Sequence, residues 1–173
     1  MRDSRHSVKA IALILALLGF SALALAKTNT TTTLSSSANP STYGSSVTFT
    51  ATVSPSAATG TVTFKNGSAT LGTGTLSGGK ATYSTSTLAA GSNSITASYG
   101  GSSSYNSSTS SALTQTVNKA TPMVTLTSSS NPSTYGSSVT FTATLSISTA
   151  TGTVTFKNGS TTLGTGTVSS GPQ

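Results

Sequence analysis

The sequence predicts an all-β protein built from β-sandwich repeats, and three observations support that prediction. Apolar residues alternate with Thr and Ser over short segments, which is the spacing of a strand with one buried face. Gly-containing pairs that favour tight turns separate these segments. One block of sequence also occurs twice at a fixed offset, as expected of a repeated domain.

The internal repeat is the strongest signal in the chain. The segment NPSTYGSSVTFTAT begins at Asn39 and recurs unchanged at Asn131, an offset of 92 residues (131 − 39). The segment ATGTVTFKNGS begins at Ala58 and recurs at Ala150 with the same offset. A unit of this length is a whole small domain rather than one turn of a solenoid.

The repeat divides the chain into three parts. We expect a signal peptide over residues 1–26, a complete first repeat over residues 27–118 and an incomplete second repeat over residues 119–173. The second copy is incomplete because Gln173 aligns with Ala81, so the later strands of the first copy have no counterpart in it.

The early strands of the first repeat are expected where the alternation is clearest. The first lies around Leu34, and the second covers residues 47–53, where Val, Phe and Ala alternate with Thr. A third covers residues 60–65, with Val62 and Phe64 on one face.

A hairpin follows the third strand, because an Asn-Gly pair at residues 66–67 favours a two-residue turn. A turn at that pair places Phe64 opposite Ala69 and Val62 opposite Leu71. All the apolar side chains of the hairpin then share one face, as a single core requires.

Three further strands complete the first repeat. One covers residues 80–88 after a Gly-Gly turn, the next includes residues 95–99, and the last contains Leu113 and Val117. The total is about seven strands in fewer than roughly ninety residues, which predicts an immunoglobulin-like sandwich.

The N-terminus has the composition of an export signal. Basic residues precede an apolar run over residues 10–25, and the run closes on the small residues Ala24 and Ala26. Cleavage after Ala26 makes the protein secreted or displayed at the cell surface. The alternative is an uncleaved anchor, which would be the only contact of the chain with a membrane.

Residue types that support catalysis are missing after the predicted signal peptide. The chain has one acidic residue, Asp3, one histidine, His6, and no cysteine. General acid–base catalysis, zinc and calcium sites and disulfide bonds need those side chains. The Ser-x-x-Lys match of Ser77 and Lys80 spans a Gly-Gly turn and lacks the partner motifs of a serine–lysine enzyme. We therefore predict no catalytic residue, no metal site, no cofactor and no enzyme activity.

The positive charge balance does not indicate a nucleic-acid partner. Beyond the predicted signal peptide the basic residues are five lysines: Lys27, Lys65, Lys80, Lys119 and Lys157. They form no basic stripe with interleaved aromatic residues, so we expect no nucleic-acid binding and interpret them as strand-edge and turn residues. Weak attraction to anionic polysaccharide stays open.

One tyrosine is a candidate ligand contact. Tyr99 is in phase with the apolar residues of its strand, which predicts a core position, and Tyr43 lies in a turn where it is expected to pack. Tyr105, in the Ser/Gly/Asn-rich loop of residues 100–110, is the best candidate for exposure and for contact with a sugar.

The second repeat is expected to expose an apolar face. The residues that would line it are Val139, Phe141, Val154 and Phe156. A face without its partner sheet should not fold stably. A truncated gene is the explanation we favour, and completion by strands from another chain is the alternative.

The motifs of the repeat resemble the bacterial Ig-like domain repeats of exported and surface proteins. The resemblance rests on N-P-S-x-Y-G-x-x-V-x-F-x-A-x-V at residues 39–53, on G-T-V-x-F-x-x-G at residues 60–67 and on I-T-A-x-Y at residues 95–99. It implies non-catalytic sandwiches strung in tandem as stalks, spacers or adhesive arms. Ser102 stands where relatives often have Asp, so a calcium or structural role of that Asp is not carried over.

We therefore predict an exported structural or adhesive module that acts as a spacer or stalk in a bacterial surface or secreted protein. Its expected partners are neighbouring Ig-like repeats. The alternative function is weak binding of an extracellular polysaccharide or a surface protein through the loop around Tyr105.

Overall fold

The structure, a computed structural model, describes residues 26–168, so the predicted signal peptide lies outside the described residues apart from Ala26. Every regular element in this range is a β-strand. The strands of the first repeat are β1 (Thr31–Ser36), β2 (Ser41–Thr42), β3 (Val47–Ser54), β4 (Thr61–Asn66), β5 (Ala69–Thr75), β6 (Lys80–Thr85), β7 (Gly91–Tyr99), β8 (Ser108–Thr109) and β9 (Leu113–Asn118). Those of the second are β10 (Val124–Ser128), β11 (Phe141–Leu145), β12 (Gly152–Asn158) and β13 (Thr161–Val168).

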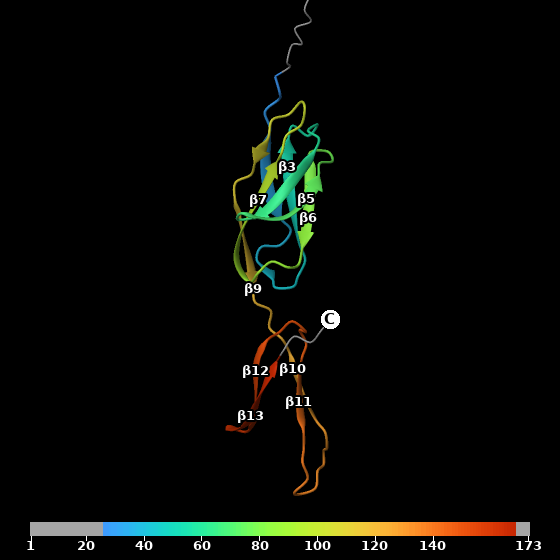
Figure 1. The fold of residues 1–173 in the computed structure, drawn as a ribbon, viewed down its shortest axis with the longest axis vertical. Helices are drawn as coiled ribbons and strands as arrows, with labels where there is room; N and C mark the ends of the chain where they lie inside the picture. The colour runs from blue at the N-terminus through green and yellow to red at the C-terminus, as the bar shows by residue number, and fades with distance from the viewer. Residues whose placement is uncertain (1–25, 169–173) are drawn as a thin grey trace, which may run out of the picture.

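The strands of the first repeat form two packed sheets (Figure 1). One has the order β1-β3-β6, and the other has the order β2-β9-β7-β4-β5, with β8 paired to β7. Neighbouring strands are antiparallel except β2 and β9, which run parallel. The predicted all-β class and the immunoglobulin-like sandwich are confirmed.

The core of the first repeat follows the predicted alternation. Buried apolar side chains recur at every second position of β3, β4 and β7: Val47, Phe49, Ala51, Val53, Val62, Phe64, Ile95, Ala97 and Tyr99. Burial of each of the larger ones contributes about 1.5–3 kcal/mol. The hydroxyl of Tyr99 donates to the carbonyl oxygen of Thr59 at 2.7 Å, so its polar atom is satisfied inside the core.

The predicted register of the β4–β5 hairpin is wrong. The turn lies one residue later than expected, because Asn66 pairs with Ala69 and Gly67 adopts a positive φ of 58°. A β-bulge between Phe64 and Lys65 then shifts the pairing. As a result, Phe64 lies opposite Gly72.

The observed register makes room for the facing strand. A Cβ added at Gly72 would overlap the ring of Tyr83 on β6, and one at Gly74 would lie 2.7 Å from the carbonyl oxygen of Thr82. The Tyr83 ring instead stacks on Phe64, with ring centroids 5.8 Å apart. The register predicted from the sequence placed Ala69 opposite Phe64 and Leu71 opposite Val62. It did not place a glycine opposite Phe64, where the Tyr83 ring needs the space.

Two short strands, β2 and β8, were not predicted, and β6 is shorter than expected. The predicted strand over residues 80–88 ends at Thr85, although Leu88 beyond it is still buried in the core. A strand of two residues is too short to show a periodic pattern in the sequence, so β2 and β8 are recognised only by their pairing with β9 and β7.

The second repeat consists of two separate strand pairs, β10–β11 and β12–β13 (Figure 1). The bulge recurs between Phe156 and Lys157, and Phe156 lies opposite Gly164 as Phe64 lies opposite Gly72. The bulge is therefore encoded locally in the hairpin.

Strand length, in contrast, depends on the neighbouring strand. β3 begins at Val47, which pairs with Thr85 of β6, whereas β11 begins only at Phe141. Val139, the counterpart of Val47, lies outside β11. The second repeat has no equivalent of β6 among the described residues, and its strand is correspondingly shorter.

We predict that Gly72→Ala destabilises the first repeat by about 1–3 kcal/mol, because the added methyl overpacks the Tyr83 ring. Gly164→Ala is the matched control at the equivalent position, where no atom lies within 4 Å of the added Cβ. It should change the free energy of unfolding by less than about 0.5 kcal/mol. Urea unfolding of the full chain, followed by tyrosine emission, measures both. Equal effects of the two substitutions would contradict the prediction.

Candidate functional site

The chain enters the first repeat through a clamp formed by the loop of residues 100–110. The amide of Thr28 donates to the carbonyl oxygen of Ser104 at 2.8 Å, and the amide of Asn106 donates to the carbonyl oxygen of Thr28 at 2.9 Å. The side-chain amide of Asn106 also donates to Oδ1 of Asn29 at 2.8 Å. The loop predicted to contact a ligand thus holds the entering chain.

Tyr105 lies inside this clamp, and the expectation that it is the exposed tyrosine is wrong. Its side chain is partly buried and packs against the hydrophobic core. Tyr43, which was expected to pack, is 42% exposed. The backbone of Tyr105 forms a parallel bridge with Thr28. A role of Tyr105 as a ligand contact stays a prediction.

The chain leaves the first repeat through a second clamp at the opposite end of the sandwich (Figure 1). β2 runs parallel to the end of β9, with Ser41 beside Val117. The amide of Tyr43 donates to the carbonyl oxygen of Asn118 at 2.8 Å. Asn39 adds a two-way contact to β9, since its side chain donates to the carbonyl oxygen of Thr114 and accepts from the amide of Thr116.

Gln115 joins this exit clamp from inside the core. The side chain is 0% exposed, yet its polar atoms are satisfied. Its Oε1 accepts from the hydroxyl of Ser36 at 2.7 Å, and its Nε2 donates to the carbonyl oxygen of Ala38 at 2.9 Å and to the hydroxyl of Ser41 at 3.2 Å. The amide therefore ties β9 to the segment that joins β1 to β2.

Gln115 was missed by sequence reasoning, although a signal for it exists. It lies midway between Leu113 and Val117, and strand alternation puts all three on the same face. A polar residue on the core face of a strand predicts a buried hydrogen-bonding group.

The predicted Ser–Lys turn is confirmed. Ser77 and Lys80 form an antiparallel bridge, with each backbone amide donating to the other residue's carbonyl oxygen at 2.9 and 3.1 Å. Among residues 26–168, no group of three or more His, Cys, Asp or Glu side chains could hold a metal ion. The same residues contain no helix long and apolar enough to cross a membrane.

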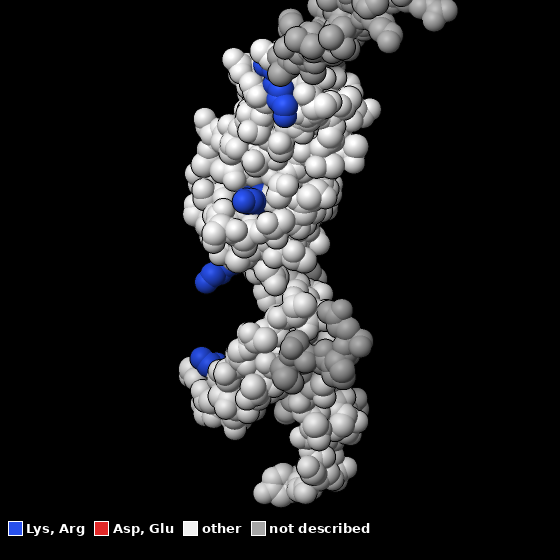
Figure 2. All heavy atoms as spheres, turned by 45° about the horizontal axis from the view of Figure 1, so that its top comes forward, with Lys and Arg blue, Asp and Glu red and all other residues white. Residues whose placement is uncertain are grey.

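The lysines lie apart from one another on the surface. On the face shown in Figure 2, their blue atoms form separate spots on an otherwise uncharged surface. This dispersal agrees with the interpretation of the lysines as strand-edge and turn residues.

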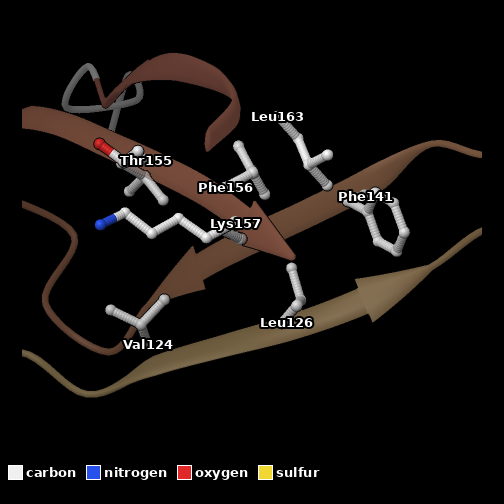
Figure 3. Close-up of a pocket in the computed structure, with 9 residues that line it drawn as sticks. Val124, Leu126, Phe141, Thr155, Phe156, Lys157 and Leu163 are labelled. Carbon is white, nitrogen blue, oxygen red and sulfur yellow. The ribbon is translucent and has the colours of Figure 1, made fainter. Parts of the chain in front are cut away.

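The second repeat presents an apolar cleft between its two strand pairs (Figure 3). The cleft has room for about 180 Å³ and is lined mainly by apolar side chains: Val124, Leu126, Phe141, Ala143, Val154, Phe156 and Leu163. Phe141 is 45% exposed, whereas its counterpart in the first repeat, Phe49, is 0% exposed. The exposed apolar face predicted from the sequence is therefore present among the described residues.

Comparison with known proteins relates the chain to one family. The family model of the bacterial Ig-like domain (group 3) matches residues 30–118. Among solved structures, the fibronectin(III)-like modules of Clostridium thermocellum CbhA match at 19% sequence identity and a TM-score of 0.42, over 50% of this chain and 94% of theirs. Comparison with the curated proteins gave no match.

We predict that Gln115→Met weakens the first repeat by about 1–3 kcal/mol, because the volume is kept while buried hydroxyl and carbonyl groups lose their partner. Thr116→Val is the matched control, since Thr116 is exposed and its side chain points away from the core. Urea unfolding of both variants measures the difference. A Gln115→Met chain as stable as the control would show that the amide network does not stabilise the clamp.

Proposed function

Because this chain belongs to the bacterial Ig-like domain (group 3) family, we propose that it is a non-catalytic structural module that acts as a spacer or stalk. Domains of this kind are typically non-catalytic. The observation on which the proposal depends is that the chain enters the first repeat at one end of the sandwich and leaves at the other (Figure 1). Repeats joined in this way extend along one axis.

The two clamps support this function physically. Tension applied along the axis pulls Thr28 and Asn118 in opposite directions. The exit clamp then carries load in shear, because β2 and β9 run parallel and their hydrogen bonds must break together. A spacer needs this arrangement, since it must transmit force without unfolding.

The surface fits the same proposal. Outside the first nine residues there is no acidic side chain, and exposed strand positions carry mostly Thr and Ser. Such a face is solvated and offers few charged contacts to a specific partner. The partners we propose are neighbouring Ig-like repeats, and the location we propose is secreted or at the cell surface.

The alternative function, weak polysaccharide or surface-protein binding through the loop around Tyr105, has less support. The backbone of that loop is engaged with residues 28–30, and the Tyr105 ring packs on the core. Little of the loop's aromatic surface is left for a sugar to stack on.

Single-molecule pulling tests whether the first repeat resists force as a spacer must. The chain has no cysteine, so Lys27→Cys and Lys119→Cys provide unique attachment points at the two clamps. We expect one force peak that releases roughly 300 Å, since the 92 residues between the handles (119 − 27) extend at about 3.3–3.6 Å each. Gln115→Met should lower the peak and Thr116→Val should not. Smooth extension without a peak would contradict the proposal.

Export is tested by the mass of the exported product. Expression in a bacterium should yield a protein that begins at Lys27, because signal peptidase cuts after a small residue. Ala26→Arg should block this cleavage, and Ala26→Ser should leave it intact. A wild-type chain held in the membrane at full mass would instead support the uncleaved anchor.

A further inference from the structure

Two Asn-Gly turns of the chain have the same local sequence but different surroundings. Residues 61–68 and residues 153–160 both read TVTFKNGS. The two glycines also take the same conformation, with a φ of 58° at Gly67 and 56° at Gly159. Any difference in reactivity between Asn66 and Asn158 therefore comes from what packs around each turn.

An asparagine that precedes glycine is chemically labile, because glycine leaves the backbone amide between them unhindered. The amide nitrogen of the glycine attacks Cγ of the asparagine and passes its proton to water. The bond from Cγ to Nδ2 breaks, and that nitrogen leaves as ammonia. Water then opens the cyclic imide to aspartate or isoaspartate, and no atom is oxidised or reduced. Ring closure thus needs a free glycine amide and an asparagine side chain that can turn toward it.

Strand β7 engages both of these groups at the first turn. The amide of Gly67 donates to the carbonyl oxygen of Ser94 at 2.8 Å. The side-chain amide of Asn66 donates to Oδ1 of Asn93 at 2.9 Å. Asn93 is 4% exposed and is itself held by donation to the carbonyl oxygen of Ala89 at 2.9 Å. Ring closure at Asn66 must break both bonds to β7, so it requires that β7 separate from β4.

The second turn shows the same sequence without these bonds. Within residues 26–168, β12 pairs with β13 alone, and neither the side chain of Asn158 nor the amide of Gly159 has a hydrogen bond like those of the first turn. Asn158 is exposed, whereas Asn66 is half-buried. The chain therefore carries a protected and an unprotected copy of one reactive turn.

We propose that Asn66 is a latent self-modification site, which deamidates when β7 separates from β4 and is protected while the two strands are paired. The reaction needs water and no enzyme. Its product places a carboxylate, which has no proton to donate, against the acceptor Oδ1 of Asn93. Rotation of the Asn93 amide does not restore the bond, because its Nδ2 already donates to Ala89. The modification therefore weakens the β4–β7 pairing permanently, and a repeat that has opened once opens more easily again.

Peptide mapping of the aged full chain by mass spectrometry measures both sites in one molecule. Trypsin cuts after Lys65 and Lys157, so the two asparagines lie in different peptides. In mildly alkaline native buffer, Asn158 should convert at least about tenfold faster than Asn66, because conversion of Asn66 must wait for local opening. In urea that unfolds the first repeat, the two rates should be equal. Equal rates in native buffer, or a difference that persists in urea, would overturn the proposal.

Asn93→Leu tests the side-chain part of the protection. The substitution keeps a similar volume and removes the acceptor, so conversion of Asn66 should accelerate at least about threefold. Ser94→Ala is the matched control, because Ser94 is exposed and accepts from Gly67 through its backbone carbonyl, which the substitution keeps. Conversion of Asn158 in the same molecules is the internal reference. An Asn66 rate that Asn93→Leu leaves unchanged would exclude a protecting role of Asn93.

Urea unfolding verifies that the Asn93→Leu chain still folds. The comparison of native buffer with urea uses the wild-type chain, so it tests the proposal even where that variant does not fold.

Asn66→Asp imitates the product of the reaction. At neutral pH it should lower the urea midpoint of the first repeat, because the buried Oδ1 of Asn93 loses its donor and gains a carboxylate beside it. Asn158→Asp is the matched control and should leave the midpoint unchanged, since Asn158 is exposed. A midpoint that Asn66→Asp does not lower would overturn the proposed effect on strand pairing.

Discussion

The pairing of β6 with β3 and of β7 with β4 is the constraint on which the rest of the first repeat depends, because it widens both sheets enough for each to bury the apolar face of the other. Phe49 is 0% exposed in these wider sheets, while its counterpart Phe141 is 45% exposed in the second repeat. The closest packing between the two sheets is at Tyr83 of β6, whose ring lies over Gly72 and stacks on Phe64. Since Tyr83 belongs to one sheet and Phe64 to the other, this single aromatic contact spans the sandwich.

The two ends of the sandwich are held by neutral hydrogen bonds, which suits a chain in which charged residues make up 5% of the sequence. Gln115 and Asn39 tie the exit strand, and Asn106 ties the entering segment. A buried amide costs less to desolvate than a buried ion pair, and its hydrogen bonds are not screened by salt. The stability that the clamps supply should therefore depend little on ionic strength.

The sequence predicted the parts of this fold that depend on alternation along one strand. The core positions of β3, β4 and β7 and the Tyr99 site were found in this way. The hairpin register was not, because a β-bulge between Phe64 and Lys65 shifts the pairing, and alternation along one strand does not reveal a bulge. The Tyr105 environment and both clamps were missed because their partners lie 74 to 79 residues away along the chain. Composition indicated which catalytic and metal-binding side chains are scarce in the sequence. The contacts between the clamp residues, in contrast, were visible only in the structure.

The second repeat separates what a β-hairpin determines by itself from what its neighbours impose. The bulge and the Phe156–Gly164 pairing persist without a covering strand, so the turn sequence alone determines them. The length of β11 and the burial of Phe141 do not persist between residues 119 and 168, where β11 and β12 each have a strand on one edge alone, so those two properties depend on neighbouring strands.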